Sequence, residues 1–174
     1  GLLLLIILRL RGIKTIWLYG GLPNRLAVAR ELGASQVIDY HDITTSAFSS
    51  LRKTLSHGFP VIIEASGSPT ALEWAFKIAP HRGRILILGD YEDARANFLW
   101  NDLLHREVEI VGSNASAGAW LSAVRLALDG SLPLEKLITH RLPFTQYAEA
   151  VEITAEQKGQ CIKVLLDWSP VVKR

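Results

Sequence analysis

The stretch Val61-Ile62-Ile63-Glu64-Ala65-Ser66-Gly67-Ser68 decides the fold of this chain. Its β-branched apolar start is typical of a strand that is buried on both faces in a parallel sheet. The run then ends in small residues, which leave room for a flat ligand and free backbone groups to bond it, at the strand end where open α/β sheets bind ligands. Pro69 predicts the first turn of a helix, where a missing N–H costs nothing. The alternative is a buried strand followed by a tight turn with no ligand.

The composition is that of an ordinary globular chain, and its 174 residues are enough for one domain with a core. A net charge of +2 is too small to indicate a nucleic-acid partner. Cys161 is the only cysteine, which excludes an internal disulfide and a multi-cysteine metal site within this sequence. The apolar run Leu2–Leu8 is shorter than the roughly 20 residues that span a bilayer and lacks the features of a signal peptide. We therefore expect a buried helix there, no membrane partner and a cytoplasmic protein.

Hydrophobic periodicity and turn residues predict an alternation of helices and strands. Helices are expected at 1–11, 23–32, 44–55, 70–78, 98–105 (or a turn there), 119–128 and 145–154 (capped by Thr145), and extended segments at 14–19, 36–39, 61–64, 84–88, 108–111, 138–142 and 161–166. The βαβ order predicts a mostly parallel sheet with helices on both faces, the α/β class. Strand ends at Gly20, Gly67, Gly89 and Gly112 indicate one crevice along one edge of that sheet.

Seven segments in this order carry a family resemblance. They are 1–5 (GLLLL), 22–34 (LPNRLAVARELGA), 61–67 (VIIEASG), 83–89 (GRILILG), 109–113 (EIVGS), 137–143 (LITHRLP) and 159–164 (GQCIKV). The chain resembles the zinc-type alcohol dehydrogenases of the medium-chain dehydrogenase/reductase superfamily. The resemblance implies a Rossmann-type doubly wound parallel sheet that is truncated before its first strand. It divides the chain into a dinucleotide-binding domain at 1–135 and a C-terminal segment at 136–174 that returns to a catalytic domain lying upstream.

The same resemblance implies a function for the parent protein: hydride transfer between NAD(P) and an alcohol or carbonyl substrate. In the family, zinc polarises the substrate oxygen while the cofactor does the redox chemistry. This chain would supply the cofactor cradle and neither a metal ligand nor a catalytic residue. A zinc-independent quinone or enoyl reductase of the same superfamily and a non-catalytic dinucleotide-binding module remain alternatives. The parent is expected to be a homodimer or homotetramer that associates through the apolar segment 98–104 and the strand at 108–111. The alternative for the apolar segment is a helix folded back on its own domain.

Twelve residues are the candidate cofactor contacts that the resemblance implies. They are Gly1, Gly20, Gly21, Arg25, Ala65, Ser66, Gly67, Gly89, Asp90, Ser113, Asn114 and Lys163. Gly1 matches the last glycine of the Gly-x-Gly-x-x-Gly fingerprint, or is simply the first residue of the sequence. Lys163 matches a basic residue that binds the pyrophosphate, with a merely exposed lysine as the alternative.

The remaining candidates near the nicotinamide come from the strand ends. Gly67 and Gly89 would let the backbone approach the ring, or would only serve turn geometry. The residues Ala65, Ser66, Ser113 and Asn114 would line the nicotinamide and its ribose, or form a polar loop edge. We expect Asp90 to be an exposed turn residue, with a substrate-side carboxylate as the alternative.

Cofactor preference is predicted from the end of the strand at 14–19. Gly20 stands where NAD-binding domains place an acidic residue on the ribose hydroxyls, and Gly21 leaves further space. Arg25 is two residues past Pro23, and a guanidinium can hold a 2′-phosphate. These features favour NADP(H) over NAD(H). The five histidines show no ligand spacing and are expected at the surface or in loops, while Cys161 is expected to be buried and inert.

Overall fold

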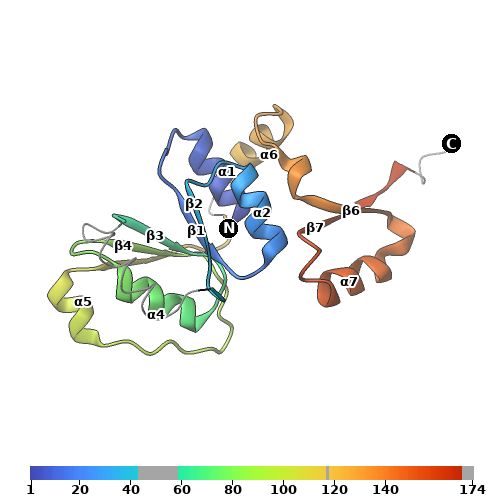
Figure 1. Ribbon diagram of the computed structural model, residues 1–174. Helices are drawn as coiled ribbons and strands as arrows, with labels where there is room; N and C mark the ends of the chain where they lie inside the picture. Colours follow the sequence, from blue (N-terminus) through green and yellow to red (C-terminus); the bar gives the residue numbers. More distant parts are fainter. Residues whose placement is uncertain (43–58, 117, 170–174) are drawn as a thin grey trace. The chain divides into compact units, whose positions relative to one another are not determined.

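The computed structural model describes residues 1–42, 59–116 and 118–169 (Figure 1). The helix predicted at 44–55 lies outside the described residues. The chain divides into two compact units, Gly1–Asp42 with Leu121–Arg174, and Ile43–Trp120, and each is described by itself. No helix in the described ranges is long and apolar enough to cross a membrane.

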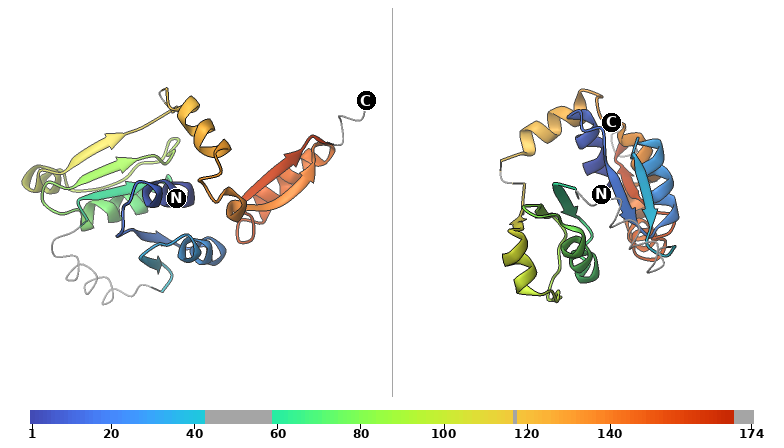
Figure 2. Two further views of the ribbon diagram at one scale, coloured as in Figure 1. Left: turned by 90° about the horizontal axis from the view of Figure 1, so that it is seen from above. Right: turned by 60° about the vertical axis from the view of Figure 1, so that its left-hand side comes forward.

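The first unit contains two small parallel sheets. Its elements are α1 (Leu2–Leu10), β1 (Trp17–Gly20), α2 (Pro23–Glu31), β2 (Gln36–Asp39), α6 (Trp120–Leu128, with its first residue in the other unit), the 3-10 turns η1 (Leu134–Leu137) and η2 (Phe144–Gln146), β6 (Ile138–Pro143), α7 (Tyr147–Glu156) and β7 (Lys163–Asp167). Strand β1 pairs with β2, and β6 pairs with β7. Helix α7 packs along β6 and β7 (Figure 2). The core of this unit joins α1 to α2 through Leu5 and Ala29, with Leu137 completing the cluster.

The second unit is a three-stranded parallel sheet in the order β3-β4-β5. Its elements are β3 (Val61–Glu64), α4 (Pro69–Ile78), β4 (Arg84–Ile87), α5 (Trp100–Arg106) and β5 (Glu109–Gly112). The register places Ile85 between Ile62 and Ile110, so that the carboxyl ends of all three strands lie at one edge. Helix α4 covers the sheet with Leu72 and Phe76, which pack with the fully buried Ile85.

Most predicted elements are confirmed within a few residues at their ends. The strand at 36–39 and the helix opened by Pro69 have the expected bounds, and Ser68 Oγ caps α4 by accepting the N–H of Ala71 at 3.3 Å. The Thr145 cap was wrong, because Thr145 lies in η2 and α7 begins only at Tyr147 without a side-chain cap. Buried Cys161 precedes β7 instead of opening it.

Two burial predictions were also wrong in part. Val61 is 50% exposed, because β3 has a single paired neighbour among the described residues, so the strand is only half buried. Helix α1 is not covered all round: Leu3 is 47% exposed, while Leu5 on the opposite face is buried. The apolar composition of α1 favours burial, but only one face of the helix packs against the core of the first unit.

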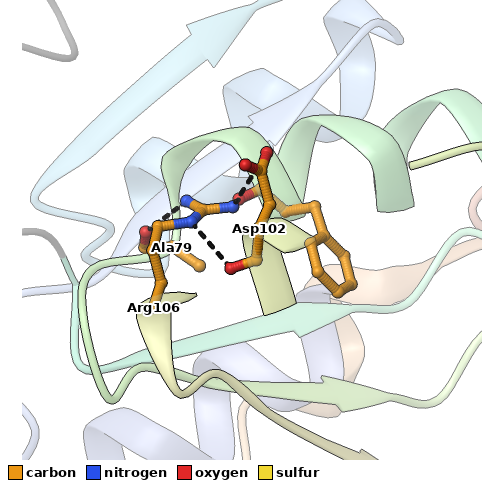
Figure 3. A network of polar contacts seen from close by, with 4 residues as sticks. Ala79, Asp102 and Arg106 are labelled. Atoms are coloured by element: carbon orange, nitrogen blue, oxygen red, sulfur yellow. Dashed lines mark hydrogen bonds and ion pairs between the residues drawn. The ribbon is translucent and has the colours of Figure 1, made fainter. Parts of the chain in front are cut away.

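Arg106 joins the carboxyl ends of α4 and α5 (Figure 3). Its guanidinium donates to the carbonyl oxygens of Phe76 at 2.8 Å and Ala79 at 3.0 Å, and lies 3.6 Å from the carboxylate of Asp102. The donor that would continue the helical ladder to Phe76 O belongs to residue 80, which is proline and has no N–H. Arg106 therefore supplies a hydrogen bond that the sequence of α4 cannot supply itself.

Candidate functional site

The carboxyl edge of the β3-β4-β5 sheet gathers most of the predicted contacts. Residues 65–67 follow β3, Gly89 and Asp90 follow β4, and Ser113 and Asn114 follow β5. Ala65, Ser66, Ser113 and Asn114 are all exposed at this edge. The prediction that these strand ends come together is confirmed for the second unit, since all three strands are parallel and in register.

A hollow of about 370 Å³ lies at this edge between the ends of β4 and β5. It is lined by Ile87, Leu88, Gly89, Asp90, Gly112, Ser113 and Asn114. A Cβ added to Gly112 would meet no atom of the described residues within 4 Å, so the strand end is open among them. Apolar strand residues with a few polar groups at the rim fit a flat ring with a polar substituent, such as a nicotinamide and its ribose.

Glu64 is the buried charged residue of this edge, with only 5% of its surface exposed. Its Oε1 accepts the backbone N–H of Ser66 at 2.7 Å and the Ser66 hydroxyl at 2.5 Å. Its Oε2 accepts the N–H of Gly67 at 3.1 Å and the Tyr91 hydroxyl at 2.6 Å. Four donors thus meet the four acceptor positions of one carboxylate.

These contacts set the ionisation of both side chains. Burial alone raises the pKa of Glu64, but the hydrogen bonds from Ser66, Tyr91 and Gly67 outweigh it, and the pKa of Glu64 lies below its ordinary value. Burial, followed by the hydrogen bond to Glu64, raises the pKa of Tyr91. Glu64 is therefore a carboxylate at neutral pH and Tyr91 a neutral phenol.

Gly67 and Gly89, at the ends of β3 and β4, interlock with each other's loops. Gly67 has φ +73°, and a Cβ there would collide with the carbonyl oxygen of Asp90. A Cβ on Gly89 would collide with the backbone nitrogen of Gly67. Both positions require glycine because the loop after β3 and the loop after β4 touch backbone to backbone. Asp90 is exposed, and its Oδ1 accepts the N–H of Glu92 at 3.0 Å, as in a turn.

The first unit holds the remaining candidates. Gly20 ends β1, and a Cβ there would approach a side-chain methyl of Leu26 at 3.2 Å, which that flexible side chain can accommodate. At Gly21, by contrast, a Cβ would collide with the ring of Tyr40. The ring of Tyr40 is tilted against the rings of Tyr19 and His41, whose centroids lie 5.7 and 4.3 Å away. Burial, and then the neighbouring Tyr40, raises the pKa of Tyr19.

Arg25 lies close to the segment before Lys163 in the first unit, although the two residues are far apart in sequence. Arg25 Nη2 donates to the carbonyl oxygen of Cys161 at 3.4 Å, two residues before Lys163. Lys163 begins β7 with an exposed side chain. Gly1 caps α1 and is exposed, and a Cβ there would meet nothing within 4 Å among the described residues.

Three residues of these edges escaped the sequence analysis. Asp39 is paired with Gly20 in the β1–β2 register, and its Oδ1 accepts the N–H of His41 at 2.9 Å. An acidic side chain therefore stands beside Gly20 on the neighbouring strand, although the strand of Gly20 has none. The sequence does contain a signal for Glu64. It is the one carboxylate between His57 and Glu73, and it directly follows an apolar run. Tyr91 left none.

Metal ligation finds no support in the described residues. No three His, Cys, Asp or Glu side chains there lie together as a ligand set. His41, His81 and His105 are exposed and His140 is half-buried, whereas His57 lies outside the described residues.

Comparison with known proteins identifies the family. A family model described as zinc-binding dehydrogenase matches residues 1–129. The L-threonine 3-dehydrogenase of Saccharopolyspora erythraea is 30% identical over 171 residues, which are 97% of this chain and 48% of that protein. The chain thus spans about half the length of the curated relatives it matches.

Solved structures match the whole fold. A protein described as a short chain alcohol dehydrogenase from Escherichia coli CFT073, in complex with NADH, matches 97% of this chain and 49% of its own with a TM-score of 0.85 at 24% identity. A zinc-binding dehydrogenase from Sinorhizobium meliloti 1021 bound to NADP matches 95% of this chain and 48% of its own, with a TM-score of 0.81 at 22% identity. The parallel α/β architecture and the family model agree with the predicted Rossmann-type cofactor domain. The chain belongs to the zinc-binding dehydrogenase family.

Proposed function

We propose that this chain binds a nicotinamide dinucleotide and forms the cofactor-binding part of an enzyme that transfers hydride between that cofactor and an alcohol or carbonyl substrate. The observation that carries the proposal is the hollow at the carboxyl ends of β4 and β5, in a chain of this family. We assign residues 1–135 to dinucleotide binding and 136–174 to a segment that returns to the catalytic domain. We expect no catalytic residue within the chain.

Each unit has its own part in this proposal. In the second unit, Ser113 and Asn114 offer polar groups to the nicotinamide ribose, while Ile87 supplies an apolar wall. In the first unit, Arg25 and Lys163 offer positive charge to the phosphates. The bound nicotinamide supplies the hydride acceptor or donor. These residues bind and orient it.

Binding is tested by titrating the full-length protein with NADH and NADPH and following energy transfer from tryptophan to the nicotinamide. We expect saturable binding of at least one of them. Asn114→Ala should weaken it about two- to tenfold, the effect of one hydrogen bond. Asn101→Ala, an exposed asparagine on α5, is the matched control and should leave it unchanged. Absence of binding at millimolar dinucleotide would refute the proposal. Binding without turnover of any alcohol or carbonyl compound would instead favour a non-catalytic module.

We further propose a preference for NADP(H) over NAD(H). Gly20 and the guanidinium of Arg25 support it, and the carboxylate of Asp39 beside Gly20 is the feature that opposes it. The test compares kcat/KM for both cofactors in the full-length protein and in Gly20→Asp. The variant should move the preference toward NAD(H), tenfold for each 1.4 kcal/mol of phosphate interaction lost. A parent that already prefers NAD(H) would refute the preference.

Association through β5 is the last part of the proposal. Among the described residues β5 has one paired neighbour, β4, and it carries Val111 at 41% exposure. Trp100 and Leu104 of α5, in the same unit, are 71% and 69% exposed. We expect the full-length protein to form a dimer or tetramer through this surface, since apolar area of this kind is seldom left bare. Light scattering tests this, and Val111→Lys should shift the protein toward the monomer. A parent that is monomeric at working concentration would exclude it.

A further inference from the structure

We infer that Glu64 is the positioning residue of the candidate cofactor site. Its carboxylate holds the loop 65–68 after β3 and the loop 89–91 after β4 in one fixed arrangement, and it acts on a bound dinucleotide through these loops. The inference deepens the proposed function and rests on it for the identity of the ligand. It assigns Glu64 no contact with the cofactor, since the residue is only 5% exposed.

Glu64 bonds both loops through its side chain and its backbone. Its carboxylate accepts two N–H groups of the first loop, from Ser66 and Gly67, and the hydroxyl of Tyr91 in the second loop. Its carbonyl oxygen accepts the N–H groups of Leu88 at 2.8 Å and Gly89 at 3.2 Å. One residue at the end of β3 therefore holds both its own loop and the path of the chain beyond β4.

The interlocked glycines show how little freedom these loops have. Gly67 and Gly89 leave no room for a Cβ between the two backbones. Small shifts of either loop would therefore be transmitted to the other. Gly89 and Asp90 line the hollow proposed for the nicotinamide, so that a displaced loop changes the shape of the hollow.

Position 64 needs two acceptor oxygens, and the shape of the side chain alone is not sufficient. The ring of Tyr91 packs against the core of the second unit, which aims its hydroxyl at Glu64. A glutamine has the same shape but one acceptor oxygen, so its NH₂ would face a backbone N–H of Ser66 or of Gly67. Tyr91 can turn its hydroxyl to accept from that NH₂, whereas a backbone N–H cannot change from donor to acceptor. Glu64→Gln therefore leaves at least one loop N–H unpaired.

The experiment measures dinucleotide Kd values in the full-length protein for Glu64→Gln and Tyr91→Phe. We expect Glu64→Gln to raise the Kd about tenfold, because it leaves a backbone N–H of the loop 65–68 unpaired, and Tyr91→Phe to raise it about threefold, because it removes only the hydroxyl that bonds Glu64. Two variants serve as matched controls. Ile85→Val destabilises the buried core of β4 and removes none of the hydrogen bonds of Glu64, and Tyr147→Phe removes a hydroxyl that is exposed on α7. Both should leave the Kd unchanged.

Amide hydrogen exchange gives a second readout that does not depend on any ligand. Exchange in peptides covering 65–68 and 89–91 should accelerate together in Glu64→Gln and stay at the parent rate in Ile85→Val. Unchanged Kd and unchanged exchange in folded Glu64→Gln would overturn the inference, as would an equal loss of affinity in Ile85→Val. If Glu64→Gln does not fold, Tyr91→Phe decides by the same two readouts. A parent that binds neither dinucleotide refutes the proposed function, and the exchange rates still decide whether Glu64 holds the loops.

Discussion

Replacing Arg106 with methionine tests whether its side chain supplies the hydrogen bond to Phe76 O that Pro80, which has no N–H, cannot donate. Methionine keeps much of the apolar stem and removes the guanidinium. The variant loses the donors to Phe76 O at 2.8 Å and Ala79 O at 3.0 Å, and the weaker contact to Asp102 O at 3.2 Å. The carbonyls of Phe76 and Ala79 then depend on water to replace the guanidinium.

The expected magnitude follows from these contacts. A hydrogen bond to a charged group contributes about 1.5–3 kcal/mol, and the Arg106 side chain is 17% exposed, so water can replace part of the loss. We expect the free energy of unfolding to fall by about 2–4 kcal/mol, and the Tm by roughly 4–16 °C. Arg106→Lys should lose less, about 1–2 kcal/mol, because an ammonium can reach one carbonyl but has no planar fork for two.

The assay is urea and thermal unfolding of the full-length protein, followed by the fluorescence of tryptophans that include Trp74 in α4 and Trp100 in α5. Arg82→Met is the matched control, because Arg82 pairs with Glu107 at 2.7 Å but is 81% exposed. Such a pair contributes at most about 1 kcal/mol. A loss in Arg106→Met that is no larger than the loss in Arg82→Met would refute the reasoning.

Three further predictions concern the same fold. The pKa of Glu64 is lower in the folded state than in the unfolded state, so ionised Glu64 stabilises the fold above the unfolded-state pKa of about 4.3, and this stabilisation is lost as the pH falls through the folded-state pKa. The difference in urea midpoint between the parent and Glu64→Gln should therefore be constant from pH 7 to about 5.5 and should close below about 4. A gap that widens on acidification would contradict this. Gly67→Ala should lower the free energy of unfolding by at least about 2 kcal/mol, because position 67 has a positive φ and a Cβ there would collide with backbone. Gly112→Ala is the control, because a Cβ there meets no described atom, and its free energy of unfolding should stay within about 0.5 kcal/mol of the parent. The 174 residues expressed on their own should be poorly soluble or partly molten, because β1 and β3 each have one paired neighbour among the described residues. They should show no alcohol oxidation with or without zinc, because the zinc ligands are expected in the catalytic domain and not in these residues. A sharp thermal transition with protected amides in both strands, or turnover that survives a chelator, would count against this.

The local chemistry of the sequence was sufficient for the order of elements. Pro23 and Pro69 open helices where they were expected to, and the strand at 36–39 has its predicted bounds. These features depend on the conformational preferences of a few neighbouring residues, which the sequence states directly. Thr145 shows the limit, since a threonine at the right spacing did not become a cap once the chain entered η2 first.

The sequence by itself determined the α/β class, the family and the strand ends that carry the candidate site. Only the tertiary structure placed Asp39 beside Gly20, brought Arg25 to the segment before Lys163, and gave Glu64 its partner Tyr91 from the next strand's loop. Each of these pairs depends on strand register or on the path of a loop between residues that are distant in sequence. Periodicity and turn chemistry act over a few residues and cannot specify such pairs, whereas packing and hydrogen bonding in the folded chain select one partner for each.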